Sequence, residues 1–338
     1  MKIFCRSLMW ILLLLSLVYT ADAKKIELKW GATSKHSGLY DNTTSIVEIV
    51  NKAYPQQIAA TVVEAQGFSD NLTKIKTKSI DLGPAGILEA SAAYNGLMEY
   101  KGKSIDELRS LWGGYVTPIH IIASKKSGVT SIDMIDGLTF AMNPETTSGK
   151  LLRLFFDAHG IKPVYKEYGI ALSLDAMKNG AVKCWYKAGF KDNAIAELEK
   201  FMEINILPVD KAMIDKMNAK YPGYGLGITV PEGTYQALKQ NQLSLAYVVS
   251  DFVHKDMPED VVYKIVKAVW GKKRQLIRNL ITLREGGFAR MYKMALDHGL
   301  AVPFHPGAAK FYQEKLKNTI PQKLLPSEMK SPPPPPAD

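Results

Sequence analysis

The sequence predicts an α/β protein in which helices cover largely parallel sheets. Short apolar stretches of strand length alternate with longer stretches whose apolar residues recur at helical spacing, from about residue 26 to residue 300. That alternation is typical of helices layered on parallel sheets. The 338 residues are long enough for two domains. The sequence contains no repeat of about 20 to 50 residues, which argues against a solenoid.

The first 23 residues have the pattern of a secretory signal peptide. Basic residues precede an apolar run from Met9 to Val18, and Ala21-Asp22-Ala23 supplies the small residues that a signal peptidase reads. The run is shorter than the roughly 20 residues that a membrane-spanning helix needs. We therefore expect cleavage of residues 1–23 before Lys24 and a periplasmic protein, with a retained membrane anchor as the alternative.

In the first third of the chain, three strands alternate with three helices. The first strand alternates apolar and polar residues, the first helix ends before Pro55, and Ser69 to Asn71 are expected to cap the second helix. We expect strands at 26–30, at 58–65 and from 81, and helices at 46–53, around 72–75 and at 87–94.

The same alternation continues through the rest of the chain. Gly160 is expected to end the helix that carries Leu151, because glycine adopts the left-handed conformation that closes a helix. Further strands are expected at 108–112, 119–124, 137–142, 182–186, 204–209 and 243–253, and helices at 151–158, 194–201, 258–270 and 272–300. Five consecutive prolines follow Ser331, so residues 321–338 are expected to form a disordered, Pro-rich tail.

Composition and missing motifs exclude several functional classes. The net charge is +10, but no run of five basic residues occurs, so we expect no nucleic-acid partner and favour small anionic ligands. Cys5 leaves with the signal peptide, which leaves Cys184 without a partner for a disulfide within the mature chain. The six histidines lack metal-ligand spacing, and no phosphate-loop, nucleophile-elbow or zinc-protease motif is complete. We expect no metal, no cofactor and no catalytic residues.

Four short polar loops each lie between a strand and the next helix, at residues 34–40, 67–71, 83–86 and 146–149. In α/β sheets such loops line the crevice at the carboxyl ends of the strands. Backbone N–H groups at the helix starts favour anionic groups there. The alternative is that the hydroxyls and amides of these loops only cap helices. Four such loops in one exported chain predict a binding cleft.

Short segments spread over residues 25–313 match the motifs of one family in order and spacing. They are residues 67–72 (GFSDNL), 81–83, 93–96, 119–122, 131–137, 221–224, 233–235, 259–263, 305–308 and 311–312. Together they resemble the TAXI family, the extracytoplasmic solute receptors of TRAP (tripartite ATP-independent periplasmic) transporters. The chain departs from the family pattern at Thr146 to Gly149, where only Ser-Gly remains, and at Lys183 and Lys191.

The resemblance implies a two-lobed α/β fold, the periplasmic binding protein-like type II fold, with a ligand cleft between the lobes. Lobe one would comprise residues 24–120 plus 246–320, and lobe two residues 121–245, joined by two hinge strands. The lobes would close on a small organic anion, an amino acid or a carboxylate, for delivery to TRAP transporter membrane subunits. Such a receptor catalyses nothing. The rival interpretations are a sensory module without a transport role and an enzyme on the same fold.

We expect loops of both lobes to contact the ligand. The candidate contacts are Ser37, Tyr40, Ser69 and Asn71 in lobe one, and Thr147, Ser148, Gly149, Lys187, Gly189 and Phe190 in lobe two. Side chains alternate along a strand, so Lys183 and Lys187 share one face and Tyr186 takes the other. We expect Lys187 to meet a ligand carboxylate; the alternative is that both lysines are solvated surface charges.

Overall fold

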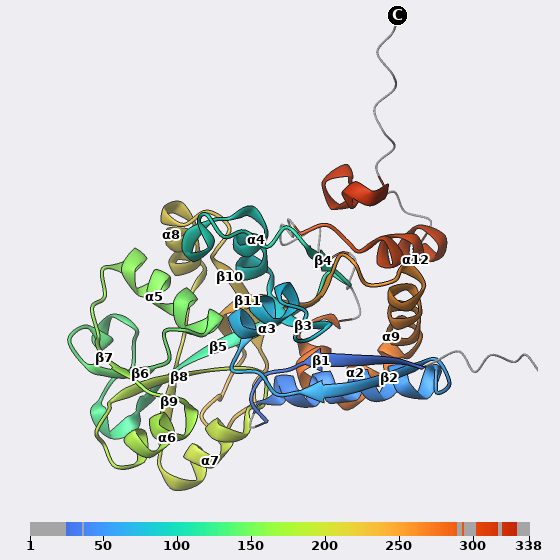
Figure 1. Cartoon of the computed structure of the whole chain (residues 1–338). Coiled ribbons are helices and arrows are strands. Elements are labelled where there is room, and N and C mark those ends of the chain that lie inside the picture. Colours follow the sequence, from blue (N-terminus) through green and yellow to red (C-terminus); the bar gives the residue numbers. More distant parts are fainter. Residues whose placement is uncertain (1–24, 36, 289–292, 294–301, 317–319, 330–338) are drawn as a thin grey trace, which may run out of the picture.

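The computed structural model describes residues 25–35, 37–288, 293, 302–316 and 320–329, and it shows two α/β lobes side by side (Figure 1). The expected signal peptide lies outside the described residues. Within them, no helix is both long enough and apolar enough to cross a membrane. The two lobes share one continuous sheet of eleven strands, which passes from one lobe into the other.

Lobe one is built on five strands in the order β2-β1-β3-β11-β4. The strands are β1 (Ile26–Gly31), β2 (Ile58–Val63), β3 (Leu82–Gly86), β4 (Leu108–Ser110) and the second half of β11 (Gln242–His254). The helices are α2 (Gly38–Ala53), α3 (Phe68–Lys76), α4 (Ile87–Asn95), α9 (Glu259–Asn279), α10 (Ile281–Glu285) and α12 (Pro306–Leu316), with the 3-10 turn η1 (Met98–Tyr100). β1 runs parallel to β2 and β3, whereas β11 runs antiparallel to β3 and β4.

Lobe two repeats this arrangement with the order β7-β6-β8-β5-β9. The strands are β6 (Thr139–Met142), β7 (Val164–Glu167), β8 (Cys184–Ala188), β9 (Ile204–Leu207) and the second half of β5 (Tyr115–Ser124), with β10 (Leu226–Val230) paired to β11. The helices are α5 (Thr147–His159), α6 (Ile170–Lys178), α7 (Asn193–Phe201) and α8 (Lys211–Lys220). Because each lobe has the same strand order around one antiparallel strand, the structure confirms the expected two-lobed α/β fold.

The long strands β5 and β11 connect the lobes. They pair antiparallel with each other from Tyr115↔Val249 to Ile119↔Leu245, and each then continues into a different set of neighbours. The expected lobe boundaries, at residues 120/121 and 245/246, fall inside these two strands and stay a prediction. The sheet is therefore mixed rather than largely parallel, because both connecting strands run against their neighbours.

Most expected elements occur, and five were missed. β7 is an edge strand with mostly exposed side chains, so it lacks the apolar alternation that marks a strand. α8 buries only Ile214 and Met217, which gives too weak an apolar stripe to indicate a helix. The other three missed elements are α6, β10 and α12. The expected cap of α3 was also misplaced, because Gly67 precedes the helix and Ser69 already lies in its first turn.

The C-terminal segment corrects the expectation of disorder from residue 321. Residues 322–324 and 327–329 form two short 3-10 turns. Leu324 is buried, and the Glu328 carboxylate lies 2.7 Å from the buried guanidinium of Arg109. One buried leucine and one ion pair therefore hold residues 321–329 against lobe one, while the proline run lies outside the described residues.

Candidate functional site

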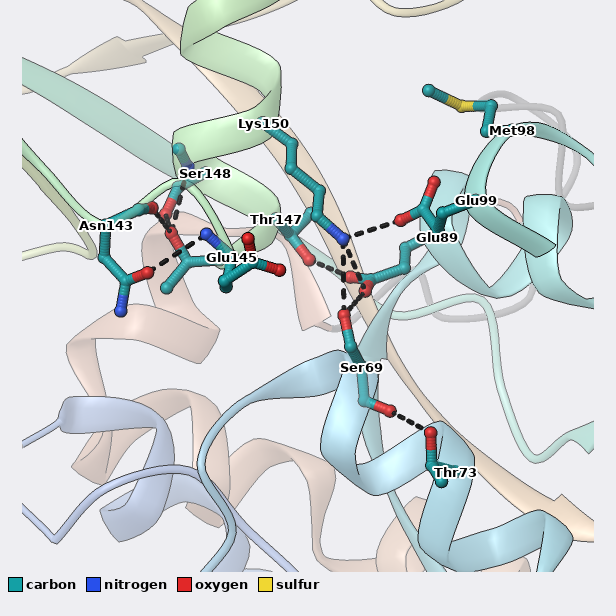
Figure 2. Close-up of polar contacts among 12 residues, drawn as sticks. Ser69, Thr73, Glu89, Met98, Glu99, Asn143, Glu145, Thr147, Ser148 and Lys150 are labelled. Atoms are coloured by element: carbon teal, nitrogen blue, oxygen red, sulfur yellow. Dashed lines mark hydrogen bonds and ion pairs between the residues drawn. The ribbon is translucent and has the colours of Figure 1, made fainter. Parts of the chain in front are cut away.

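Five polar side chains from both lobes meet where α3, α4 and α5 come together, and we call them the interlobe cluster. They are Ser69 on α3, Glu89 on α4, Glu99 in η1, and Thr147 and Lys150 on α5 (Figure 2). The Ser69 hydroxyl donates to one oxygen of the Glu89 carboxylate, and the Thr147 hydroxyl donates to the other. Since Ser69 belongs to lobe one and Thr147 to lobe two, Glu89 joins the lobes directly.

Lys150 adds a second connection between the lobes. Its ammonium lies 2.6 Å from Glu99 Oε1, 3.5 Å from Ser69 Oγ and 3.9 Å from Glu89 Oε1. Burial opposes its charge, but the hydrogen bond to Glu99 and the charge of Glu89 together raise the pKa of Lys150. Lys150 is therefore a cation, and its strongest partner is Glu99.

Glu89 is 7% exposed, in contrast to the partly exposed Glu99. Desolvation by burial raises the pKa of Glu89, and it outweighs the hydrogen bonds from Ser69 and Thr147 and the charge of Lys150. For Glu99, burial is outweighed by the Lys150 hydrogen bond and charge, which lower its pKa. Two carboxylates of different burial thus face one ammonium.

Two glycines shape the contact between the helices, Gly67 through its backbone angles and Gly86 through its missing side chain. Gly67, at φ 156°, adopts backbone angles that favour glycine and starts α3 with Ser69 turned toward Glu89. Gly86 precedes α4, and a Cβ atom on it would lie 2.8 Å from Cγ2 of Thr147. The absence of a side chain at Gly86 therefore lets α5 of lobe two reach α4 of lobe one.

A cavity of about 50 Å³ adjoins the interlobe cluster. Besides cluster residues, its lining is apolar or aromatic and comprises Leu88, Ala92, Met98, Leu151, Leu154, Tyr224 and Tyr247. The Tyr224 hydroxyl donates to Sδ of Met98 at 2.9 Å, which is another contact between the lobes. The volume suits about one or two water molecules, so the lobes must part before any larger solute can enter.

The start of α5 is held by internal contacts. The Thr146 hydroxyl accepts from the Gly149 N–H at 3.1 Å and lies 2.7 Å from the Tyr186 hydroxyl. A Cβ atom on Gly149 would come 2.1 Å from the Asn143 carbonyl oxygen, so only glycine fits there. Ser148 is buried, with its hydroxyl 3.4 Å from that of Thr146. These contacts fix the helix start that presents Thr147 and Lys150.

Of the ten candidate contacts, the structure brings Ser69 and Thr147 together. Ser37 caps α2 by accepting from the Leu39 N–H at 3.2 Å, and Tyr40 lies half-buried in the first turn of the same helix. Asn71 is fully buried and donates to the carbonyls of Ala32 at 3.1 Å and Pro84 at 2.9 Å. The contacts of Asn71 thus bind the ends of β1 and β3 together inside lobe one.

The candidates Lys187, Gly189 and Phe190 make their contacts within lobe two and with the connecting strand β5. The Lys187 ammonium lies 2.7 Å from Oδ2 of Asp192, and both side chains are buried. The Gly189 carbonyl accepts from Nε2 of His120 at 2.8 Å. Phe190 is buried in the core of lobe two. A ligand contact of Lys187 stays a prediction, but its charge is already neutralised by Asp192.

Glu89, Glu99 and Lys150 were missed in the sequence. Glu89 is the one carboxylate in an otherwise apolar and small-residue stretch from Ile87 to Ala93, which was a signal for a buried acid. Lys150 follows Ser148-Gly149 directly and could have been placed at the helix start. Within the described residues, no group of three His, Cys, Asp or Glu side chains is arranged to hold a metal ion.

The model of the NMT1-like family matches residues 31–315 of this chain. Solved structures of similar fold include the probable amino-acid ABC transporter extracellular-binding protein YtmK from Bacillus subtilis, at 13% identity and a TM-score of 0.48, covering 78% of this chain and 99% of that one. Another is the periplasmic aliphatic sulphonate binding protein SsuA from Escherichia coli, at 14% identity and a TM-score of 0.44, covering 85% and 84%.

A third is the alkanesulfonate-binding protein SsuA from Xanthomonas axonopodis pv. citri bound to MOPS, at 15% identity and a TM-score of 0.46, covering 90% of this chain and 96% of that one. At these TM-scores, the likenesses carry no argument about what this chain binds. The match of the family model covers most of the chain and carries the assignment.

Proposed function

The chain belongs to the NMT1-like family, and we propose that it is an extracytoplasmic receptor that captures a small organic solute between its two lobes. The interlobe cluster is the observation that carries this proposal. Its hydroxyls, carboxylates and ammonium come from both lobes and complete one another around a cavity. When the lobes part, these groups lose their partners, and a solute can supply new ones as the lobes close again.

Lobe two offers groups that favour the expected ligand, which is a small organic anion such as an amino acid or a carboxylate. Lys150 and the N-terminal turn of α5 lie on the same side of the cluster. An ammonium and free backbone N–H groups together favour a carboxylate. The net charge of +10 also favours the approach of anions.

The binding test is a thermal-shift screen of the purified protein against small organic acids, amino acids and sulfonates. A solute at 100 times its Kd should add about 2.7 kcal/mol to the free energy of unfolding. Thr147→Val removes one hydroxyl of the cluster and should weaken binding about 5- to 150-fold, which corresponds to the roughly 1–3 kcal/mol lost with a buried hydrogen-bond partner. Thr130→Val, on an exposed threonine, is the matched control. A screen without any stabilising solute contradicts the proposal.

Delivery of the solute to TRAP membrane subunits is the finer part of the proposal, and the TAXI-like segments between residues 67 and 312 support it. Uptake of the solute into membrane vesicles that carry the membrane subunits encoded beside this protein tests it. TRAP transport should collapse when the ion gradient is dissipated and should not require ATP. Uptake that depends on ATP indicates an ABC transporter, and binding without uptake indicates a sensory role.

The proposed location is the periplasm, reached through cleavage of residues 1–23. The apolar run followed by Ala21-Asp22-Ala23 supports this proposal. Mass spectrometry of the exported protein should find Lys24 as the first residue. Recovery of the full-length chain in the membrane fraction is the contrary result.

A further inference from the structure

We propose that the solute carries a protonated amine, and that Glu89 is the residue that selects it. The inference rests on the proposed solute-receptor function and names the chemical class of the solute. It starts from how charge is divided between the two lobes. Lobe one supplies the carboxylates of Glu89 and Glu99, whereas lobe two supplies the ammonium of Lys150 and the N-terminus of α5 (Figure 2).

In the closed structure, the interlobe cluster holds two carboxylates and one ammonium. Lys150 is shared by two carboxylates and lies closer to Glu99, at 2.6 Å, than to Glu89, at 3.9 Å. The remaining partners of Glu89 are the two neutral hydroxyls of Ser69 and Thr147. A buried carboxylate is costly unless a cation or several hydrogen bonds compensate it. A solute that brings only negative charge would worsen this imbalance, whereas an ammonium group would compensate the Glu89 carboxylate.

Opening the lobes increases the demand for a cation at Glu89. Among the described residues, Lys150 is the cation whose charge acts on Glu89, and it moves away with lobe two. Lys103 acts on Glu99 from within lobe one. The Thr147 hydroxyl also leaves with lobe two. An open form would therefore present Glu89 with the Ser69 hydroxyl and without Lys150, next to the entering solute.

The lining of the neighbouring cavity indicates the chemistry of the rest of the solute. Its wall beside Glu89 is made of aliphatic, thioether and aromatic side chains. An amine on an apolar body fits this wall, and a carboxylate at the other end of the solute would meet Lys150 and the start of α5. The solute class is therefore a small zwitterion that turns its amine toward lobe one and its acid toward lobe two.

Titration calorimetry with matched compounds tests the inference. Each trio comprises an amino acid, the same acid without the amine, and the same amine without the carboxyl group. The first trio is L-leucine, 4-methylpentanoate and 3-methylbutylamine, and the second is L-phenylalanine, 3-phenylpropanoate and 2-phenylethylamine. The set is extended to the other common amino acids. We expect at least one amino acid to bind, and its acid without the amine to bind at least tenfold more weakly. An acid that binds as tightly as its amino acid overturns the inference, even without any variant.

Glu89→Gln keeps the length of the side chain and an oxygen that can accept from Ser69 or Thr147. We expect it to weaken binding of the amino acid at least tenfold while the melting temperature without solute stays within a few degrees. Glu27→Gln, on an exposed glutamate of β1, is the matched control and should change neither. Equal affinity in Glu89→Gln and wild type overturns the inference.

The two proposals fail in different ways. If acids without an amine bind between the lobes and no amine-bearing compound does, the solute-receptor function stands and the role of Glu89 is refuted. If no compound of the wider screen binds, the receptor function itself is refuted, and the inference is refuted with it.

Discussion

At the scale of single residues, Lys187 shows how a polar side chain expected in the cleft takes a structural role. Its ammonium and the Asp192 carboxylate form a buried ion pair at 2.7 Å, and Asp192 also accepts from the Ala194 N–H at the start of α7. Strand alternation correctly placed Lys187 and Tyr186 on opposite faces. It could not show that the chain folds back after Phe190 to bring Asp192 against the lysine.

Lys187→Met should therefore reduce the stability of the fold. Removing the ammonium leaves the buried Asp192 carboxylate without compensation, which costs about 3–5 kcal/mol. The double variant Lys187→Met/Asp192→Asn should recover most of this loss, since asparagine still caps α7. Urea unfolding measures both, with the exposed Lys183→Met as the control. A single variant as stable as wild type would show that the ion pair contributes nothing to folding.

Asp251 should make the free energy of unfolding fall as the pH rises. Burial in lobe one raises its pKa from 3.8 to about 6, although the Trp30 indole N–H donates to it at 2.9 Å. Between these two pH values, the folded protein keeps a proton that the unfolded chain has released. Asp251 therefore makes its full contribution to the free energy of unfolding below about pH 4. This contribution of roughly 3 kcal/mol is lost as the pH rises to about 6.

Asp251→Asn removes this dependence. Its stability relative to wild type should rise by about 3 kcal/mol between pH 4 and pH 7, as measured by urea unfolding at each pH. The comparison with wild type is needed because buried His120 and His305 have opposite effects. Burial lowers the pKa of each to about 4, so they destabilise the fold as the pH falls. A difference between variant and wild type that is constant with pH would refute the role given to Asp251.

At the scale of elements, the contact between α4 and α5 determines whether the lobes can close. Gly86 has φ −65° and ψ 135°, which alanine adopts without strain. A Cβ atom there would nevertheless lie 2.8 Å from the methyl group of Thr147. Gly86→Ala should thus hinder closure without disturbing either lobe. Crowding of this kind costs about 1–3 kcal/mol, so solute affinity in calorimetry should fall about 5- to 150-fold.

Thr147→Ser provides the matching rescue, because serine keeps the hydroxyl and lacks the methyl group. Gly86→Ala/Thr147→Ser should regain most of the lost affinity. If Gly86→Ala leaves the affinity intact, or if the serine fails to rescue it, the lobes do not close through this contact.

The position of each site residue in its strand or helix explains whether the sequence could indicate it. Ser69 and Thr147 were accessible because they lie where a strand passes into a helix, a position that topology directs toward the crevice. Glu89 was missed: the apolar stretch around it indicated burial, but its carboxylate meets Thr147 of the other lobe, a contact that no local pattern shows. Asn71 had the right position, but its side chain turns inward and bonds two carbonyls of its own lobe.

At the scale of the whole molecule, the two lobes have one plan with opposite charge at their contact. Local patterns predicted most strands and helices, since apolar periodicity is a local property. They could not predict that β5 and β11 cross between the lobes, because the pairing of distant strands leaves no periodicity in either. The two lobes followed from the family resemblance alone, and the structure supports that fold with the same strand order in both.

Hydrogen–deuterium exchange with the tightest-binding solute of the screen tests whether the solute binds between the lobes at the interlobe cluster. The account predicts added protection in α3, α4 and α5 together, at residues 68–76, 87–95 and 147–159, and none in the distant helix α9. Protection confined to another surface, such as the hollow beside Arg109 and Glu328, or to one lobe only, would contradict it.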